Sequence, residues 1–264
     1  MKKILLLTII LSLLNSCNLD NNTNLQVYKR PYKQSLAGKK ILLYGDSISS
    51  TDYVWYKEYM ELLTGAEVYN AGFSGFNTAQ LAKNEQLQRI WDYNPDLIIC
   101  LVGGNDSGTK GSVGSFGNTQ ETSVDETDID EDYLGTHFIQ AASHIMKKIE
   151  QYYNLQNTSC DSICKPYLVF CTPLPQKREN DSNPFSQKEN WERKRDAIVE
   201  VCSKYQVHCI DLYNYCSWDF SQEPYWTSPT DMTTNRGVYT MDGLHPNKYG
   251  YEYIARVICG DLAI

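Results

Sequence analysis

Four short segments, far apart in the sequence, carry side chains that could together perform acyl transfer. They are GDSIS at residues 45–49, NAGFSG at 70–75, GGND at 103–106 and DGLHP at 242–246. Ser47 is a candidate nucleophile, His245 a candidate base and Asp242 a candidate acid that orients the base. Backbone N–H groups and the Asn105 amide could stabilise a developing oxyanion.

The serine needs a partner, because a free hydroxyl is barely ionised at neutral pH. Asp242 precedes His245 by three residues, so one turn of chain can carry both side chains. The carboxylate would then hold one ring nitrogen and leave the other facing Ser47. The remaining histidines are expected to be surface or core residues, since they fall in helix or strand patterns: His137, His144 and His208.

With these segments in this order, the chain resembles the SGNH (GDSL) hydrolase family over roughly residues 36–264. The resemblance implies ester hydrolysis and an α/β fold: a three-layer α/β/α sandwich of the flavodoxin-like SGNH hydrolase type. It also implies an oxyanion hole made by the backbone N–H groups of Ser47 and Gly75 and the Asn105 side chain. Gly72 competes with Gly75 for the second role, and the family pattern favours the later glycine.

The neighbouring acids Asp46 and Asp106 are expected to bond loop backbone rather than to take part in the reaction. No cofactor is expected. No metal is expected either, because no cluster of residues has the spacing of metal ligands.

Short apolar runs alternate with helical patterns along the chain, which indicates a five-stranded, mostly parallel sheet covered on both faces. In such sheets the site lies at the carboxyl ends of the strands, where Ser47, Gly75 and Asn105 fall. Strands are predicted at 39–44, 67–69, 97–102, 167–171 and 207–211. Helices are predicted at 53–63, 78–92, 133–153, 188–205 and 247–258.

The N-terminus has the features of a bacterial lipoprotein signal peptide at 1–16. Two lysines precede an apolar stretch, and Leu14-Asn15-Ser16-Cys17 resembles a lipobox, in which Cys17 becomes the lipidated first residue. A polar tether at 17–35 would join this anchor to a hydrolase domain at 36–264. We therefore expect a lipid-anchored protein of the bacterial cell envelope, held to a membrane through Cys17. An ordinary signal peptide with an incidental cysteine is the alternative.

The nine cysteines leave an even number once Cys17 is set aside, in a route that is oxidising. Cys160 and Cys164 are candidates for a local disulfide, and Cys202 and Cys209 could also pair. Cys100 and Cys171 lie in apolar strand runs and are expected to be buried thiols.

The amino-acid composition limits the size of the domain and the kind of partner that the protein can bind. With 264 residues and 42% hydrophobic content, the chain suits one large domain. The 32 acidic residues against 24 basic ones argue against a nucleic-acid partner. The acidic stretch 121–132 has alternate acids, as a calcium loop has, but Tyr133 stands where an EF-hand needs glycine, so a solvated loop is favoured.

Two long loops, 106–132 and 212–241, leave from the expected site face, and loops of this length are expected to be either functional or disordered. The second is rich in aromatic residues, which could stack on sugars but for the most part are expected to pack the loop onto the domain. They are Tyr213, Tyr215, Trp218, Phe220, Tyr225, Trp226 and Tyr239.

We therefore expect an esterase that removes short acyl groups, in particular acetyl, from a carbohydrate or small-molecule ester. The alternatives are a lipase or lysophospholipase with the same mechanism, and a non-catalytic glycan-binding lipoprotein on a hydrolase scaffold. The sequence predicts no oligomeric state.

Overall fold

The computed structural model describes residues 36–115, 135–157, 165–176, 188–216, 218 and 237–263. The chain divides into two units, Met1–Pro31 and Tyr32–Ile264, and every described residue belongs to the second. Cys17, the tether, the Cys160–Cys164 pair and the acidic stretch 121–132 lie outside the described residues.

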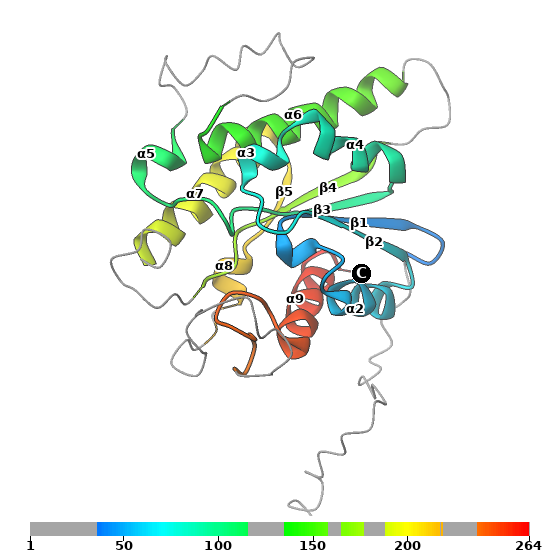
Figure 1. The fold of residues 1–264 in the computed structure, drawn as a ribbon. Helices are drawn as coiled ribbons and strands as arrows, with labels where there is room; N and C mark the ends of the chain where they lie inside the picture. Colours follow the sequence, from blue (N-terminus) through cyan, green and yellow to red (C-terminus); the bar gives the residue numbers. More distant parts are fainter. Residues whose placement is uncertain are drawn as a thin grey trace, which may run out of the picture. The chain divides into compact units, whose positions relative to one another are not determined.

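A five-stranded sheet in the order β2-β1-β3-β4-β5 forms the centre of the second unit (Figure 1). Its strands are β1 (Lys40–Gly45), β2 (Glu67–Gly72), β3 (Leu97–Leu101), β4 (Tyr167–Cys171) and β5 (His208–Ile210). Every neighbouring pair is parallel. The predicted α/β class is confirmed, and the sheet is parallel throughout rather than mostly so.

The strand residues alternate between two buried clusters, one on each face of the sheet. In β1, Ile41 and Leu43 belong to one cluster, and Leu42 and Tyr44 to the other. Because both faces are buried, these strands read as continuous apolar runs in the sequence.

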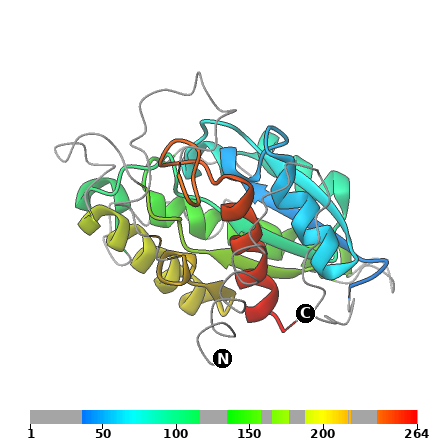
Figure 2. The same ribbon diagram turned by 90° about the horizontal axis from the view of Figure 1, so that it is seen from below.

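Helices cover both faces and complete the three layers. α2 (Val54–Thr64) and α9 (Lys248–Asp261) pack side by side on the first face, as Figure 2 shows in blue and red. The opposite face is covered by helices that Figure 1 shows on the other side of the sheet, among them α3 (Thr78–Leu81), α4 (Asn84–Tyr93), α6 (Phe138–Asn157) and α7 (Lys188–Tyr205).

Some element boundaries differ from the prediction. The single helix expected at 78–92 is two, because Lys83 has extended backbone and stands as N-cap of α4. The helix expected from 133 begins only at Phe138. Three short helices were not predicted: η1 (Ser47–Ser49), α5 (Lys110–Val113) and α8 (Leu212–Tyr215).

The cysteines of the described residues are thiols. Cys100 and Cys171 are buried and free, as predicted. The pairing considered for Cys202 and Cys209 is not formed: both are free thiols. Cys202 lies on the sheet-facing side of α7, among apolar side chains, where a thiol packs as a small hydrophobe.

No helix in the described ranges is long and apolar enough to cross a membrane.

Candidate active site

The turn that carries Ser47 follows β1 directly. Asp46 is the N-cap of η1, and its Oδ1 accepts a hydrogen bond from the backbone N–H of Ile48 at 3.1 Å. From α9, the Tyr251 hydroxyl donates to the Ile48 carbonyl at 3.1 Å. The turn is therefore held from both sides, and Ser47 lies where a parallel sheet presents its site.

Ser47, His245 and Asp242 form one hydrogen-bonded chain. The distance from Ser47 Oγ to His245 Nε2 is 3.0 Å, and from His245 Nδ1 to Asp242 Oδ2 it is 2.7 Å. Because a carboxylate can only accept, Nδ1 carries the proton and Nε2 is free to accept from the serine hydroxyl. All three side chains are buried.

The carboxylate of Asp242 also fixes the loop that holds the histidine. Its Oδ1 accepts from the backbone N–H groups of Leu244, at 2.9 Å, and His245, at 2.6 Å. Burial would raise the pKa of Asp242, but the hydrogen bonds and the charge of His245 outweigh it and lower that pKa below its ordinary value. Asp242 therefore stays ionised at neutral pH.

An aromatic ring lies against the imidazole. Tyr53 stacks on His245 with ring centroids 5.2 Å apart and an angle of 28° between the planes, and Tyr53 packs in turn on Tyr251. Sequence reasoning missed this contact, and its only signal was an aromatic residue just before the helix that became α2. The ring limits the orientations open to His245.

Candidate oxyanion donors come from three loops. Among the described residues, the backbone N–H groups of Ser47 and Gly75 have no hydrogen-bond acceptor. The loop of Gly75 lies against the serine turn, since Ser74 Oγ donates to Ser50 Oγ at 3.3 Å. Asn105 donates through Nδ2 to the carbonyl of Phe76 at 3.0 Å, and the second hydrogen of this amide remains for a ligand.

The two competing glycines have different surroundings. A Cβ on Gly72, the last residue of β2, would lie 2.3 Å from the carbonyl oxygen of Asp46, so Gly72 lets two backbones touch. Gly75 has a φ of +81° and nothing within 4 Å of its Cβ position. Gly75 therefore has open space beside it, as a ligand site needs.

Asp46 and Asp106 join these loops to one another, which confirms the expectation that they bond loop backbone. Asp46 Oδ2 accepts from the backbone N–H of Gly104 at 3.1 Å. Asp106 accepts from the N–H of Thr78 at 2.9 Å and from its hydroxyl at 2.8 Å. Burial raises the pKa of Asp46 to about 6, against the hydrogen bonds from Ile48 and Gly104, and burial likewise raises the pKa of Asp106.

The model of the GDSL-like lipase/acylhydrolase family matches this chain over residues 43–253. The chain belongs to this family. It is an ester hydrolase of the SGNH type.

Solved structures share the fold of this GDSL-like hydrolase at low identity. A possible lipase from Chitinophaga pinensis is 18% identical, with a TM-score of 0.57 over 85% of this chain and 98% of that one. The acetyl xylan esterase AlAXEase is 20% identical, with a TM-score of 0.51 over 84% and 98%. A catalytic mutant of Axe2, an acetylxylan esterase from Geobacillus stearothermophilus, is 12% identical, with a TM-score of 0.51 over 87% and 96%. No curated protein sequence matches the chain.

The other histidines of the hydrolase lie apart from Ser47. His208 is bonded on both ring nitrogens, by Tyr167 and Asp261, so it is a satisfied surface histidine as predicted. His144 is buried in α6, and His137 directly precedes that helix. Within the described ranges, no group of three or more histidine, cysteine or acidic side chains could hold a metal ion.

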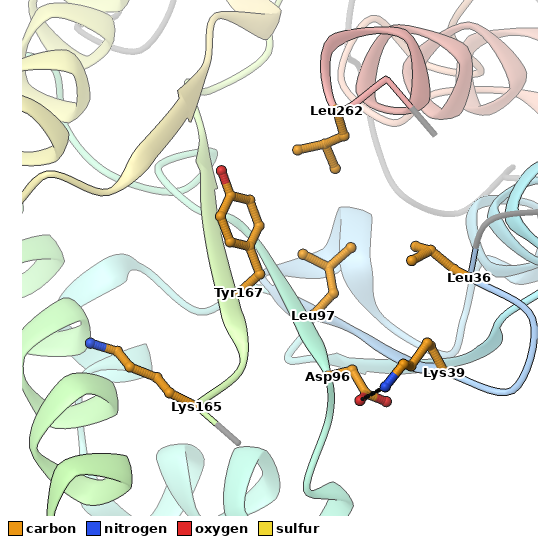
Figure 3. Close-up of a pocket in the computed structure, with 7 residues that line it drawn as sticks. All are labelled: Leu36, Lys39, Asp96, Leu97, Lys165, Tyr167 and Leu262. Atoms are coloured by element: carbon orange, nitrogen blue, oxygen red, sulfur yellow. Dashed lines mark hydrogen bonds and ion pairs between the residues drawn. The ribbon is translucent and has the colours of Figure 1, made fainter.

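A cavity of about 360 Å³ lies at the N-terminal ends of the strands, the opposite end of the sheet from Ser47 (Figure 3). It lies at the beginnings of β1, β3 and β4, whereas Ser47 and Asn105 follow strand ends. The cavity is therefore separate from Ser47 and Asn105. Its lining residues are Leu36, Lys39, Asp96, Leu97, Lys165, Tyr167 and Leu262.

Tyr213, Trp218 and Tyr239 of the second long loop pack onto the domain as expected, whereas Tyr215 is exposed. Trp218 is buried and stacks on Tyr239 with centroids 5.5 Å apart, and Tyr239 contacts Tyr253 of α9. Tyr213 lies under the guanidinium of Arg195. Phe220, Tyr225 and Trp226 lie outside the described residues.

Proposed function

We propose that this protein is a serine esterase that removes short acyl groups, in particular acetyl, from carbohydrate esters. The observation that carries the proposal is the hydrogen-bonded chain from Asp242 through His245 to Ser47, with links of 2.7 and 3.0 Å. Nucleophile and base within hydrogen-bonding distance, with the base oriented by a third group, are the requirements for covalent acyl transfer.

In the acylation step, Ser47 Oγ attacks the ester carbonyl carbon while its proton passes to His245 Nε2. The C=O electron pair moves onto the oxygen, and the N–H groups of Ser47 and Gly75 and the Asn105 amide stabilise that charge. The tetrahedral intermediate then collapses, the C–O bond to the alcohol breaks, and the alcohol takes the proton from Nε2. Asp242 balances the positive charge of the imidazolium throughout.

Deacylation repeats these steps with water. His245 Nε2 takes a proton from the attacking water, the oxyanion forms in the same place, and Ser47 leaves as an alkoxide that regains the proton. The carboxylic acid is released and the enzyme is restored. No step requires a metal or a cofactor.

The substrate class rests on less direct support. Two of the structural relatives are named as acetylxylan esterases, and the loops that leave the site face are polar in sequence. A long-chain lipase would need a broad apolar groove for the acyl chain. We therefore propose a substrate whose short acyl group binds beside Ser47 and whose glycan part lies outside this site.

The test is hydrolysis of p-nitrophenyl esters from acetate to palmitate and of acetylated xylan by the full chain, with Ser47→Ala as the blank. We expect turnover of acetate esters and release of acetate from the glycan, both lost in the variant. A rate that rises with chain length would instead indicate a lipase or lysophospholipase. No turnover at all would leave the glycan-binding lipoprotein.

We also propose that the esterase is anchored to the bacterial cell envelope through lipid on Cys17. Lys2 and Lys3, the short apolar stretch and Leu14-Asn15-Ser16-Cys17 support this. A lipidated Cys17 with more than one acyl chain would hold the protein stably on a membrane. Fractionation of cells that express the wild type or Cys17→Ala tests it, and a wild type that is wholly soluble with an unmodified N-terminus would refute it.

A further inference from the structure

A lysine is buried beneath the loop that carries Asn105. Lys194 of α7 has no exposed surface. Its Nζ donates to the backbone carbonyl of Gly103 at 2.7 Å and to that of Asp106 at 3.1 Å. The ammonium also lies 3.3 Å from the centre of the Trp191 ring. Burying an ammonium group costs free energy unless the group is well hydrogen-bonded. The two carbonyls of this loop provide such hydrogen bonds to Lys194.

The two carbonyls that Lys194 binds enclose Asn105. Gly103 lies two residues before it and Asp106 one residue after it, so the ammonium holds both sides of the segment. Between them the Asn105 amide reaches the Phe76 carbonyl, one residue beyond Gly75. The backbone that aims the amide is therefore fixed from α7.

The same helix approaches the loop at two more places. Arg193 donates through a guanidinium N–H to the Gly108 carbonyl at 3.3 Å. A Cβ on Gly108 would lie 2.4 Å from the carbonyl oxygen of Asn190, so helix and loop are in close contact. The N-terminal half of α7 thus serves as the support for residues 103–108.

An acidic side chain of the same loop lies within electrostatic range of Lys194. Asp106 is buried, and Lys194 acts on it as a nearby positive charge. The carboxylate of Asp106 in turn holds Thr78, which begins α3 just after the Gly75 loop. Lys194 therefore supports both the Asn105 loop and the contact that ties it to the Gly75 loop.

We propose that Lys194 is a positioning residue for the oxyanion hole, which acts through Asn105 by holding the carbonyls of Gly103 and Asp106. It does not touch the substrate. The inference rests on the proposed function, since it assigns Lys194 a role in stabilising the oxyanion on that route. Loss of Lys194 should therefore lower kcat rather than raise KM, because the oxyanion forms only after attack by Ser47.

The test is a double-mutant cycle of Lys194→Met and Asn105→Ala, with p-nitrophenyl acetate as the substrate of the full chain. Active sites are counted with a phosphonate ester, so that kcat refers to folded enzyme. We expect Lys194→Met to lower kcat at least about tenfold with KM nearly unchanged, which is part of the loss for removing an oxyanion donor. In the Asn105→Ala background the same change should cost less than about threefold, because coupled residues are not additive.

Lys188→Met is the matched control, since Lys188 is on the same helix with a side chain that is 81% exposed. It should leave kcat unchanged. If Lys194→Met does not fold, Lys194→Met/Asp106→Asn removes both buried charges and is compared with Asp106→Asn alone. The same loss of kcat is expected from that comparison.

Equal losses in both Asn105 backgrounds, or an unchanged kcat in Lys194→Met, would overturn the positioning role. A purely structural lysine would lower the melting temperature without this coupling. Failure of the proposed function is distinguishable, because it would appear in the wild type as no turnover of acetate esters or a rate that rises with chain length, or as turnover retained by Ser47→Ala, whatever Lys194 does.

Discussion

Asp46 and Gly104 join the turn that carries Ser47 to the loop that carries Asn105. Asp46 Oδ2 accepts from the backbone N–H of Gly104 at 3.1 Å, so the residue beside Ser47 holds the residue beside Asn105. A Cβ on Gly104 would lie 2.6 Å from the same oxygen, so a larger residue would displace the carboxylate. The contact explains why an acid is tolerated in a fully buried place.

This buried acid should leave a mark on stability. Burial raises the pKa of Asp46 from 3.8 to about 6, so the folded state keeps a proton that the unfolded chain has lost. The contribution of this proton to the free energy of unfolding is fully present below about pH 4. It is lost as the pH rises through about 6, which lowers the free energy of unfolding by up to about 3 kcal/mol. Asp46→Asn cannot titrate, so its free energy of unfolding should fall less than that of the wild type over this range.

Urea unfolding at pH 4 and pH 7 measures the difference. Asp92→Asn, at an exposed position of α4, is the control and should follow the wild type. Parallel pH dependences for the wild type and Asp46→Asn would show that Asp46 is not perturbed.

The Tyr53 ring should matter more than its hydroxyl for the histidine. The ring stacks on His245 at 5.2 Å, and such contacts are worth about 1 kcal/mol. Tyr53→Leu should therefore lower kcat about fivefold, whereas Tyr53→Phe keeps the ring and should retain most of it. Steady-state kinetics on p-nitrophenyl acetate decide, and an equal loss in both variants would assign the effect to the hydroxyl.

Gly72 should not tolerate a methyl group. A Cβ there would meet the Asp46 carbonyl oxygen at 2.3 Å and the Ser49 carbonyl carbon at 2.5 Å, both backbone atoms that cannot rotate away. Gly72→Ala should lower the free energy of unfolding by at least about 2 kcal/mol.

Gly260 of α9 is the comparison, because nothing lies within 4 Å of its Cβ position. Gly260→Ala should be neutral or stabilising by up to about 1 kcal/mol. Thermal and urea unfolding of both variants give the answer, and a Gly72→Ala protein as stable as the wild type would contradict the packing at this junction.

The sheet and the candidate site segments could be predicted from sequence because their signals are local. Runs such as Leu97–Leu101 are buried on both faces, so their composition alone marks them as strands. Ser47, Gly75 and Asn105 follow such runs, and in a parallel sheet the C-terminal ends of all strands lie on the same side of the molecule. The three-residue spacing of Asp242 and His245 likewise placed both in one loop, and the structure joins them at 2.7 Å.

The contacts between distant segments could not be predicted. Lys194 reads as one charge among many in an amphipathic helix, and only the packing of α7 places it under Gly103. Tyr53 meets His245 because α2 and α9 pack on the same face. The break between α3 and α4 lies at Lys83, whose extended backbone separates two helices that the sequence pattern had joined into one.

The most direct test of the proposed oxyanion hole is Asn105→Ala. The variant removes the amide that could meet the oxyanion, along with its bond to the Phe76 carbonyl. We expect kcat to fall about 10²- to 10³-fold with little change in KM, because the interaction is made in the transition state. Rates are measured above a Ser47→Ala blank, and the melting temperature reports any general loss of structure. An effect confined to KM would mean that Asn105 binds the substrate in its ground state, and the oxyanion hole would then consist of the backbone donors of Ser47 and Gly75.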